Sequence, residues 1–263
     1  MRLEFSKYQA TGNDFILIDN RSQKLMLSEE TIRFLCDRHF GIGADGLIIV
    51  EVKEGKLFMA YFNSNGRPGS FCGNGSRCFA LFLVHLKTAK TGEWIFYEAY
   101  DGPHQSKVLS TDFIETVMNV NSKPYSIVLE NMAAPTWFAD SGSPHVLIEW
   151  PHNPFRLADE KFLEIAKCIR NHSMFDQPAG VNVNLLFEDS GNWYIRTFER
   201  GVESETLSCG TGVTAAFLMI HEKLKQNVIH FKTKGGELSV SKSSDGRIIL
   251  CGPARQVFTG IWN

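Results

Sequence analysis

Short runs of branched and aromatic residues recur along the chain and set the pattern from which its elements are predicted. Such runs are typical of β-strands, because these side chains pack well on a pleated surface. They lie at residues 16–19, 47–52 and 56–62 in the first half, and at 146–150, 183–187 and 193–198 in the second. Between them, residues 28–39 and 158–172 have the one-sided apolar spacing of amphipathic helices. Ser28 is the predicted N-cap of the first helix, with Glu29 and Glu30 at its positive end.

Two further segments are apolar on every face. Residues 78–84 read Cys-Phe-Ala-Leu-Phe-Leu-Val, and residues 215–220 read Ala-Ala-Phe-Leu-Met-Ile. A helix without a polar face has to be enclosed by the rest of its domain. Because strands surround both segments in the sequence, the pattern predicts an α+β fold in which a mixed β-sheet curls around one central buried helix.

The two halves of the chain repeat each other. Residues 12–19 resemble residues 142–149 at an offset of 130, and residues 43–51 resemble 180–188 at an offset of 137. Cys72-Gly73-Asn74-Gly75 matches Cys209-Gly210-Thr211-Gly212, also at an offset of 137. Short strings of glycine and apolar residues recur in many α/β chains, but a shared order at nearly constant spacing favours two pseudo-symmetric copies of one domain. We predict one domain from residues 1–118 with 250–263 and the other from 119–249.

Composition and charge narrow the classes of function. The 263 residues carry a formal net charge of −2, and 43% are hydrophobic, which is typical of a globular protein. A chain without a basic excess is a poor partner for nucleic acid or an anionic membrane. Its longest nearly apolar run, residues 78–86, is about half of what a bilayer requires. The first residues lack an apolar leader, so we predict a cytoplasmic protein.

The placement of two cysteines suggests chemistry. The sequence has no C-x-x-C or H-x-x-x-H spacing, so neither a disulfide scaffold nor a zinc site is expected. Cys72 and Cys209 each precede a glycine at the start of a predicted buried helix. The N-terminus of a helix binds anions such as carboxylates, and it stabilises a thiolate over a thiol. Packing is the alternative for both, and it is the expectation for the other four, Cys36, Cys78, Cys168 and Cys251.

Matched cysteines in two repeats suggest a different task from that of a single nucleophile. A pseudo-twofold axis would bring Cys72 and Cys209 to opposite sides of one small carboxylate. One thiolate would then remove the proton from the adjacent carbon, and the opposing thiol would deliver a proton to the other face. This arrangement suits inversion at a carbon next to a carboxylate. A redox couple of the two thiols is the alternative chemistry.

Beyond these patterns, the chain resembles the diaminopimelate epimerase family over nearly its whole length. The motifs behind the resemblance are Cys72-Gly73-Asn74-Gly75-Ser76-Arg77-Cys78, Glu199-Arg200-Gly201-Val202 and Glu205-Thr206-Leu207-Ser208-Cys209-Gly210-Thr211-Gly212. The resemblance implies an isomerase that interconverts LL- and meso-diaminopimelate, in lysine and peptidoglycan precursor biosynthesis, without a cofactor or a metal. It also implies two similar α+β domains, with the last strand returning to the first domain.

The resemblance assigns roles to individual residues. It makes Cys72 and Cys209 the two acid/base thiols. The implied substrate-binding residues are Asn13, Asn63, Gly73, Asn74, Asn182, Glu199, Arg200, Gly210 and Thr211. Among them, the guanidinium of an arginine suits a carboxylate, whereas the carboxylate and amide oxygens suit an ammonium group. His145 is either part of the active-site wall or a hydrogen-bonding core residue.

Three departures from the family's pattern leave the substrate less constrained than the reaction. Ser143 stands where the family often has Asn, Gly46 where it sometimes has Gln, and Glu203-Ser204 where it has one Gly. The proline racemase group is a rival that also uses two cysteines, and the phenazine-biosynthesis isomerase group lacks the pair. A non-catalytic small-molecule binding protein on the same fold would not need both thiols. The expected partner is a small amino-acid substrate, and a homodimer is left open.

Overall fold

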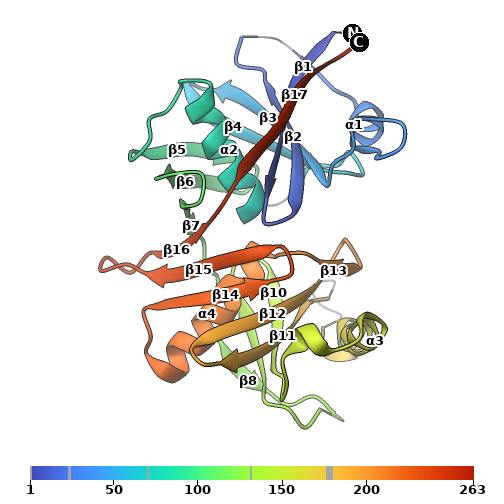
Figure 1. The fold of residues 1–263 in the computed structure, drawn as a ribbon, viewed down its shortest axis with the longest axis vertical. Helices are drawn as coiled ribbons and strands as arrows, with labels where there is room; N and C mark the ends of the chain where they lie inside the picture. The colour runs from blue at the N-terminus through green and yellow to red at the C-terminus, as the bar shows by residue number, and fades with distance from the viewer. Residues whose placement is uncertain (1, 23–24, 70, 131, 176–179) are drawn as a thin grey trace. The chain divides into compact units, whose positions relative to one another are not determined.

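The computed structural model describes residues 2–22, 25–69, 71–130, 132–175 and 180–263. The chain divides into two compact units, each of which is visible in Figure 1. Unit 1 comprises Met1–Val117 and Gly252–Asn263, and unit 2 comprises Met118–Cys251. The last residues of the chain therefore belong to the same unit as the first ones.

Unit 1 is built on a mixed sheet. Its strands are β1 (Leu3–Ala10), β2 (Asn13–Asp19), β3 (Gly46–Lys53), β4 (Lys56–Asn63), β5 (Trp94–Ala99), β6 (Gly102–Val108), β7 (Ile114–Met118) and β17 (Arg255–Trp262). They pair in the order β17, β1, β2, β3, β4, β5, β6, β7, and only β2–β3 and β4–β5 in this order are parallel. Helix α1 (Glu29–Cys36) joins the first parallel pair, and helix α2 (Gly73–His85) joins the second. A parallel pair requires such a crossover.

Unit 2 is built in the same way. Its strands are β8 (Tyr125–Ile127), β9 (Thr136–Asp140), β10 (Pro144–Glu149), β11 (Asn182–Asp189), β12 (Asn192–Glu199), β13 (Ser204–Thr206), β14 (Val228–Thr233), β15 (Gly236–Lys242) and β16 (Ile248–Gly252). They pair in the order β8, β9, β10, β11, β12, β14, β15, β16, with β13 beside β12, and β10–β11 and β12–β14 are parallel. Helix α3 (Asp159–Arg170) joins the first parallel pair and helix α4 (Gly210–Leu224) the second, and short 3-10 turns lie at η1 (Pro154–Arg156) and η2 (Ser173–Phe175).

The two units repeat one topology. In each, an antiparallel pair leads into a parallel pair joined by an amphipathic helix, and a second parallel pair joined by a buried helix follows. The corresponding series are β1–β2–β3–β4–β5 and β9–β10–β11–β12–β14. The strands predicted from the branched and aromatic runs lie within these elements or end within one residue of them. The α+β class is confirmed.

Helices α2 and α4 are enclosed within their own units. Residues 73–83 of α2 are all buried, and so are residues 210–217 of α4. In unit 1, Phe79 and Leu83 belong to a core cluster with Tyr8, Phe15 and Val50 of the sheet. Burying one large apolar side chain stabilises the fold by about 1.5–3 kcal/mol relative to leaving it exposed. The prediction that these apolar segments are enclosed helices is confirmed.

The first amphipathic helix is shorter than predicted. Its start is confirmed, because the Ser28 hydroxyl accepts the N–H of Thr31 at 3.1 Å. Its end is not, since α1 stops at Cys36 instead of reaching residue 39. The carboxylate of Asp37 accepts the N–H groups of His39 and Phe40, at 2.7 and 2.8 Å. A short acidic side chain that bonds the following backbone in this way favours a turn over another helical turn.

The four cysteines predicted to pack differ in their burial. Cys36 and Cys78 are buried, and burial raises the pKa of the Cys36 thiol to about 12. Cys251 is half-buried, but Cys168 is exposed, so the packing prediction is wrong for Cys168. In α3 the buried face is formed by Phe162, Ala166 and Ile169, and position 168 falls on the opposite side of the helix.

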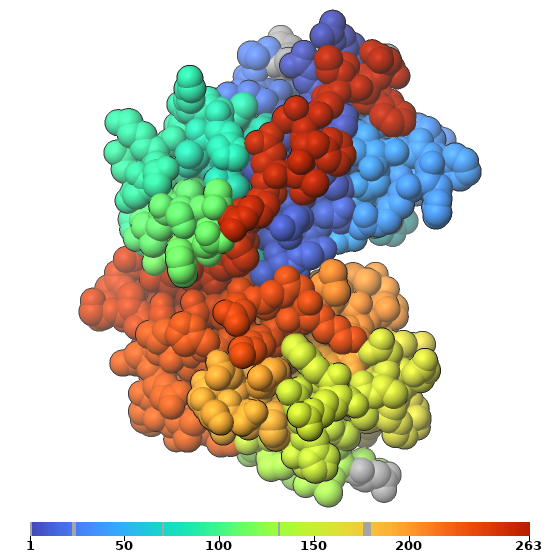
Figure 2. Space-filling model, viewed as in Figure 1, coloured from blue at the N-terminus to red at the C-terminus, as the bar shows by residue number. Residues whose placement is uncertain are grey.

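Strand β17 pairs with β1 and is an edge strand of the sheet of unit 1. Figure 2 shows it in dark red across the surface of this unit. Its residues Val257, Phe258 and Ile261 are exposed. In the part of the chain that the structure describes, no helix combines the length and the apolar character needed to span a bilayer.

Candidate active site

Cys72 stands at the N-cap of the enclosed helix α2. Its backbone is extended, with φ −125° and ψ 107°, and its sulfur accepts the N–H of Gly75 at 3.3 Å. A Cβ at Gly75 would lie 3.2 Å from both Ile48 Cδ1 and Met59 Cε, so the glycine lets the helix start close against the sheet. The first N–H groups of a helix have no acceptor within it, and they create a positive end. The Cys72 thiol therefore sits where an anion is favoured.

Asn13 lies beside the Cys72 sulfur and is bonded to Asn74. Asn13 Oδ1, at the start of β2, is 3.9 Å from Cys72 Sγ and accepts Asn74 Nδ2 at 3.4 Å. Asn74 is buried in the first turn of α2, and its Oδ1 accepts Arg77 Nη2 at 2.8 Å. Asn63 ends β4, and its Oδ1 accepts the hydroxyl of Tyr61 at 2.9 Å. Unit 1 therefore brings Asn13, Asn74 and the Cys72 thiol together.

Arg77 anchors this turn from inside the unit. Its side chain is fully buried. It donates to the carbonyl oxygens of Gly73 and Pro253, both at 3.3 Å, and to Thr11 Oγ1 at 3.2 Å, besides Asn74. A buried charge is tolerated when hydrogen bonds surround it. Arg77 thus ties the helix start to the β1–β2 turn and to the returning C-terminal segment.

Cys209 occupies the corresponding place in unit 2. It is the N-cap of α4, with φ −127° and ψ 113°. Its sulfur lies 3.3 Å from the hydroxyl oxygen of Thr211. A Cβ at Gly212 would lie 2.8 Å from Asn184 Oδ1, so this glycine too permits a close approach of helix and sheet. Cys209 is 6% exposed. It stands at the positive end of α4, as Cys72 stands at the positive end of α2.

A neutral histidine positions Thr211. Both hydrogens of Asn184 Nδ2 are accounted for, by the carbonyl oxygen of Val146 at 2.9 Å and by His145 Nδ1 at 3.1 Å. His145 Nδ1 is then an acceptor, so the ring proton is on Nε2, which lies 3.0 Å from Thr211 Oγ1. Asn182 Nδ2 is also 3.3 Å from Nε2, but its two hydrogens have acceptors in Ser143 and Pro144. Because Thr211 accepts from His145, its own hydroxyl proton can be donated to the sulfur of Cys209.

Burial fixes the charge state of this histidine. His145 is 0% exposed. Burial away from water, together with the nearby positive charge of Arg200, lowers the pKa of His145 to about 3. The imidazole is therefore neutral around pH 7. Its described partners are protein groups, so it supports the Cys209 turn from behind.

Asn182 connects the same cluster to Arg200. The Asn182 amide nitrogen donates to Ser143 Oγ at 2.7 Å and to the Pro144 carbonyl at 3.0 Å. Its oxygen accepts the backbone N–H of Arg200 at 2.8 Å. Arg200 Nη1 lies 3.4 Å from the carbonyl oxygen of Gly180, and Glu199 is the last residue of β12. The Asn182 side chain therefore bonds the backbone of Pro144 and Arg200, while Glu199 and Arg200 stand together at the end of β12.

Sequence reasoning left several supporting residues unassigned. Asp45 accepts Asn13 Nδ2 at 2.7 Å, and Ser141 Oγ donates to the Thr211 carbonyl at 2.7 Å. Arg77 lies inside a recognised motif and Asn184 inside the repeated segment 180–188, yet no role was given to either. Asn184 offered a signal, because a second polar residue in a strand otherwise rich in apolar residues has to find a partner when it is buried.

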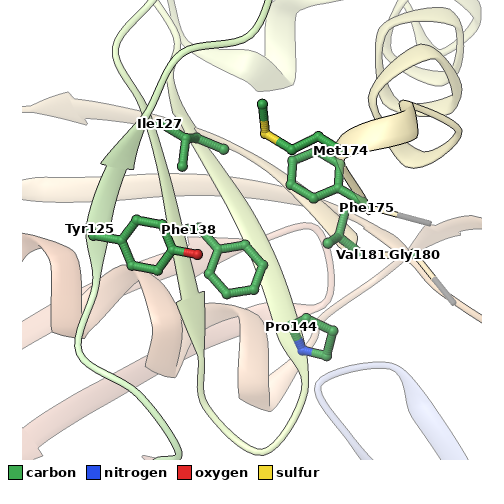
Figure 3. A pocket seen from close by; sticks show the side chains of 8 residues that line it. All are labelled: Tyr125, Ile127, Phe138, Pro144, Met174, Phe175, Gly180 and Val181. Atoms are coloured by element: carbon green, nitrogen blue, oxygen red, sulfur yellow. The ribbon is translucent and has the colours of Figure 1, made fainter. Parts of the chain in front are cut away.

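A cavity in unit 2 adjoins this cluster, because its lining includes Pro144 and Gly180, whose carbonyl oxygens bond Asn182 and Arg200. It has a volume of about 230 Å³ and is lined by Tyr125, Ile127, Phe138, Pro144, Met174, Phe175, Gly180 and Val181 (Figure 3). The rings of Tyr125 and Phe138 lie side by side, with centroids 5.4 Å apart. Apart from the Tyr125 hydroxyl the lining side chains are apolar and none is charged, so the cavity lacks the cationic partner that suits a carboxylate.

Comparison with known proteins finds similarity over the whole chain. The family model described as diaminopimelate epimerase matches residues 5–97 and 137–257. A diaminopimelate epimerase of Chlorobaculum tepidum is 38% identical over 258 residues, which are 95% of this chain and 97% of that protein. A diaminopimelate epimerase of Flavobacterium psychrophilum is also 38% identical, over 97% of this chain and 98% of that protein.

Solved structures share the fold at low sequence identity. A phenazine biosynthesis protein of the PhzF family from Bacillus anthracis superposes with a TM-score of 0.74 at 15% identity, over 100% of this chain and 99% of that one. A hydroxyproline epimerase of Agrobacterium vitis, with bound trans-4-hydroxy-L-proline, has a TM-score of 0.72 at 13% identity, over 99% and 91%. At such identity the likeness concerns the fold alone.

Proposed function

We propose a function from one premise: the chain belongs to the diaminopimelate epimerase family. It is an isomerase that interconverts LL- and meso-diaminopimelate, the reaction of lysine and peptidoglycan precursor biosynthesis. The observation that carries the mechanism is the repeated N-cap cysteine. Cys72 and Cys209 have matching backbone angles, and each starts a helix enclosed in its own unit.

In the proposed mechanism, the two cysteines act as a base and an acid on one α-carbon. A thiolate takes the α-proton from one face, leaving its electron pair on the carbon and the adjacent carboxylate. The opposing thiol then gives its proton to the other face and becomes the thiolate. The α-proton is weakly acidic, so the developing charge needs donors that are already in place, and losing one typically costs about 10²–10³ in rate. The mechanism requires both sulfurs to reach the same carbon.

The helix starts are the proposed site of the reacting carboxylate. Gly73 and Asn74 in unit 1, and Gly210 and Thr211 in unit 2, would offer backbone N–H groups in the favourable field of a helix terminus. No resident cofactor has a step in this mechanism, because the electron pair stays next to a carboxylate that these donors stabilise.

The end of diaminopimelate that does not react also needs partners. Arg200 would bind its carboxylate through a planar guanidinium. Glu199, Asn13 and Asn63 would accept hydrogen bonds from its ammonium group. Asn182 would act through the backbone of Arg200, whose N–H it holds at 2.8 Å. His145 would act through Thr211.

The setting of the reaction follows from the chemistry of the thiols. Both cysteines have to stay reduced, which suits the cytoplasm, and we place the enzyme there. The ligand is a small amino acid, and a homodimer remains a prediction that sedimentation of the purified protein would check.

The experiment that tests the function follows the α-proton. Purified protein, dialysed against a chelator, is incubated with LL-diaminopimelate in heavy water. The LL- and meso-isomers are then separated, and their deuterium content is measured by mass spectrometry. We expect meso-product that carries one deuterium, while the LL-substrate recovered early carries almost none, because the acid and the base are different groups. Equal labelling of both would indicate a single base. Turnover of L-proline or trans-4-hydroxy-L-proline in place of diaminopimelate would move the chain to the rival group.

A further inference from the structure

The amide of Asn13 lies between a carboxylate and the Cys72 turn. Its nitrogen is 2.7 Å from Asp45 Oδ2. Its oxygen is 3.9 Å from the Cys72 sulfur and 3.4 Å from Asn74 Nδ2. Asp45 precedes β3 and is 32 residues from Asn13 in the sequence, so it approaches the catalytic turn only through the pairing of β2 with β3.

The contact with Asp45 decides which way the Asn13 amide points. An ionised carboxylate only accepts hydrogen bonds, so it must face the amide nitrogen. The oxygen of Asn13 is then directed at the turn, where it meets the thiol of Cys72 and the amide nitrogen of Asn74. Rotating the amide by half a turn would set two oxygens against each other at Asp45 and two nitrogens against each other at Asn74. One carboxylate therefore determines the polarity of the group beside the sulfur.

Asp45 is itself held in place. Its Oδ1 accepts Arg38 Nη2 at 2.7 Å, and its Oδ2 accepts the backbone N–H of Asp14 at 3.2 Å. Arg38 also bonds Asp14 at 2.7 Å, and the buried Lys7 pairs with Asp14 at 2.7 Å. Although burial acts against it, the hydrogen bonds from Arg38 and Lys7 hold the pKa of Asp14 well below its usual range. Asp45 itself is 42% exposed, so these hydrogen bonds and ion pairs, and not burial, hold its carboxylate beside Asn13.

We propose that Asp45 is a positioning residue of the epimerase, which acts on catalysis only through the Asn13 amide. This inference rests on the proposed function. With Asp45 in place, Asn13 Oδ1 is an acceptor for the S–H of Cys72 and for the ammonium group of a bound amino acid. Without it, the amide can present its N–H groups, which oppose an ammonium group and favour the thiolate over the thiol.

A double-mutant cycle tests this inference. Asp45→Ala, Asn13→Ala and the double variant are assayed for epimerisation and for α-proton exchange, with wild-type activity shown first. We expect each single variant to lower kcat/KM by about tenfold or more, since a polar contact at the site is lost. We also expect the double variant to be no worse than Asn13→Ala. Losses that multiply would overturn the proposal, because Asp45 would then act by another route.

A matched control and a swap keep the test informative. Asp112 is a carboxylate of the same unit that also pairs with an arginine, Arg255, and it is 58% exposed. Asp112→Ala should leave kcat/KM within about twofold, as a surface ion pair contributes little. Should Asp45→Ala fail to fold, the pair Asn13→Asp and Asn13→Asp/Asp45→Asn decides. The double variant Asn13→Asp/Asp45→Asn again has an amide donor facing a carboxylate, so its kcat/KM should exceed that of Asn13→Asp by about tenfold. Its pH profile of kcat/KM should move to higher pH, because a negative charge now lies beside Cys72. Equal activity of these two variants would contradict the proposal, whereas an inactive wild type would contradict the proposed function instead.

Discussion

The Cys–Gly turns of the two units have the same backbone conformation but differ in the side chains that support it. Cys72 and Cys209 have φ and ψ angles within about 10° of each other. The second residue after each cysteine is polar, Asn74 in unit 1 and Thr211 in unit 2. The Thr211 hydroxyl lies 3.3 Å from the Cys209 sulfur, and Asn74 bonds Asn13, whose oxygen is 3.9 Å from the Cys72 sulfur. The backbone of the turn is therefore set by the cysteine N-cap, the glycines and the enclosed helix, which both units have.

The supports behind these side chains differ in charge. Asn74 is held at 2.8 Å by the charged guanidinium of Arg77, whereas Thr211 lies 3.0 Å from the neutral imidazole of His145. Cys72 faces an amide oxygen, and Cys209 faces a hydroxyl that can donate. An oxygen acceptor suits a thiol and a donor suits a thiolate. A duplicated turn can thus keep its shape while its supports make the two thiols unequal.

The largest effect is expected where both turns are needed at once. Cys72→Ala and Cys209→Ala each remove one of the two proton carriers, and a positioned acid or base is typically worth about 10²–10⁴ in rate. We expect each variant to lose about 10³-fold or more of epimerisation, measured from the ratio of LL- to meso-diaminopimelate. One single variant that retains substantial epimerisation would mean that only one turn is catalytic.

The controls for this prediction are the other thiols. Cys168 is exposed on α3, and Cys168→Ala should leave the rate unchanged within about twofold, as surface substitutions usually do. Cys78 is fully buried in α2, so Cys78→Ala should keep most activity and cost some stability. If Cys78→Ala lost as much activity as Cys72→Ala, the losses would indicate general destabilisation.

A second effect is expected in stability, and it should be larger for a variant in the turn of unit 1 than for one in the turn of unit 2. Arg77 and Thr214 are equivalent in the repeat, and Thr214 Oγ1 donates to the carbonyl of Gly210 at 2.8 Å. Arg77→Met leaves several buried acceptors unpaired and should lower the free energy of unfolding by about 3 kcal/mol. Thr214→Val should cost about 1 kcal/mol, the usual value of one hydrogen bond. Urea unfolding of both variants measures the difference, and equal losses would mean that the two turns depend on these supports alike.

The sequence made the shared part of the two turns predictable. Glycine after cysteine, an all-apolar helix and a repeat at constant spacing are local patterns, and the enclosed helices and cysteine N-caps follow from them. The strands were predictable for the same reason, since residues such as Ile16 and Val183 carry the preference of their own segment.

The supports were less predictable, because they depend on contacts between distant segments. Asp45 reaches Asn13 only once β2 and β3 have paired, and His145 could be read as active-site wall or as core until its burial was known. The end of α1 was missed for a local reason, the turn formed by the Asp37 side chain. The exposure of Cys168 could have been predicted, because Phe162, Ala166 and Ile169 mark the apolar face of α3 in the sequence and position 168 lies off that face.

A third effect should appear as a pH dependence of stability in unit 2. In the unfolded chain a histidine titrates near pH 6.5, whereas burial and the charge of Arg200 lower the pKa of His145 to about 3 in the folded state. Below pH 6.5 the unfolded chain therefore binds a proton that the folded chain refuses until about pH 3. The contribution of His145 is complete above pH 6.5 and is lost as the pH falls toward 3.

The measurement compares His145→Asn with the wild type. Between pH 7.5 and 5.0 the wild type should lose about 2 kcal/mol of unfolding free energy through this residue, and His145→Asn should lack that loss. His152, which is exposed, provides the control, and His152→Asn should keep the acid sensitivity of the wild type. An acid limb identical in all three proteins would show that His145 is accessible to protons in the folded state.

The smallest effect concerns Glu203, part of the pair that departs from the family's pattern. Its carboxylate accepts Arg170 Nη2 at 2.8 Å and the N–H of Gly201 at 3.0 Å, and it is 51% exposed. An ion pair this open contributes at most about 1 kcal/mol. We therefore expect Glu203→Ala to change the KM for diaminopimelate by less than about threefold and kcat not at all, with Glu203→Gln closer still to the wild type, because Gly201 keeps its acceptor. A KM raised about tenfold or more in both variants would mean that the charge of Glu203 helps to orient Arg200 for the substrate. A rise in Glu203→Ala alone would assign that role to the hydrogen bond with Gly201.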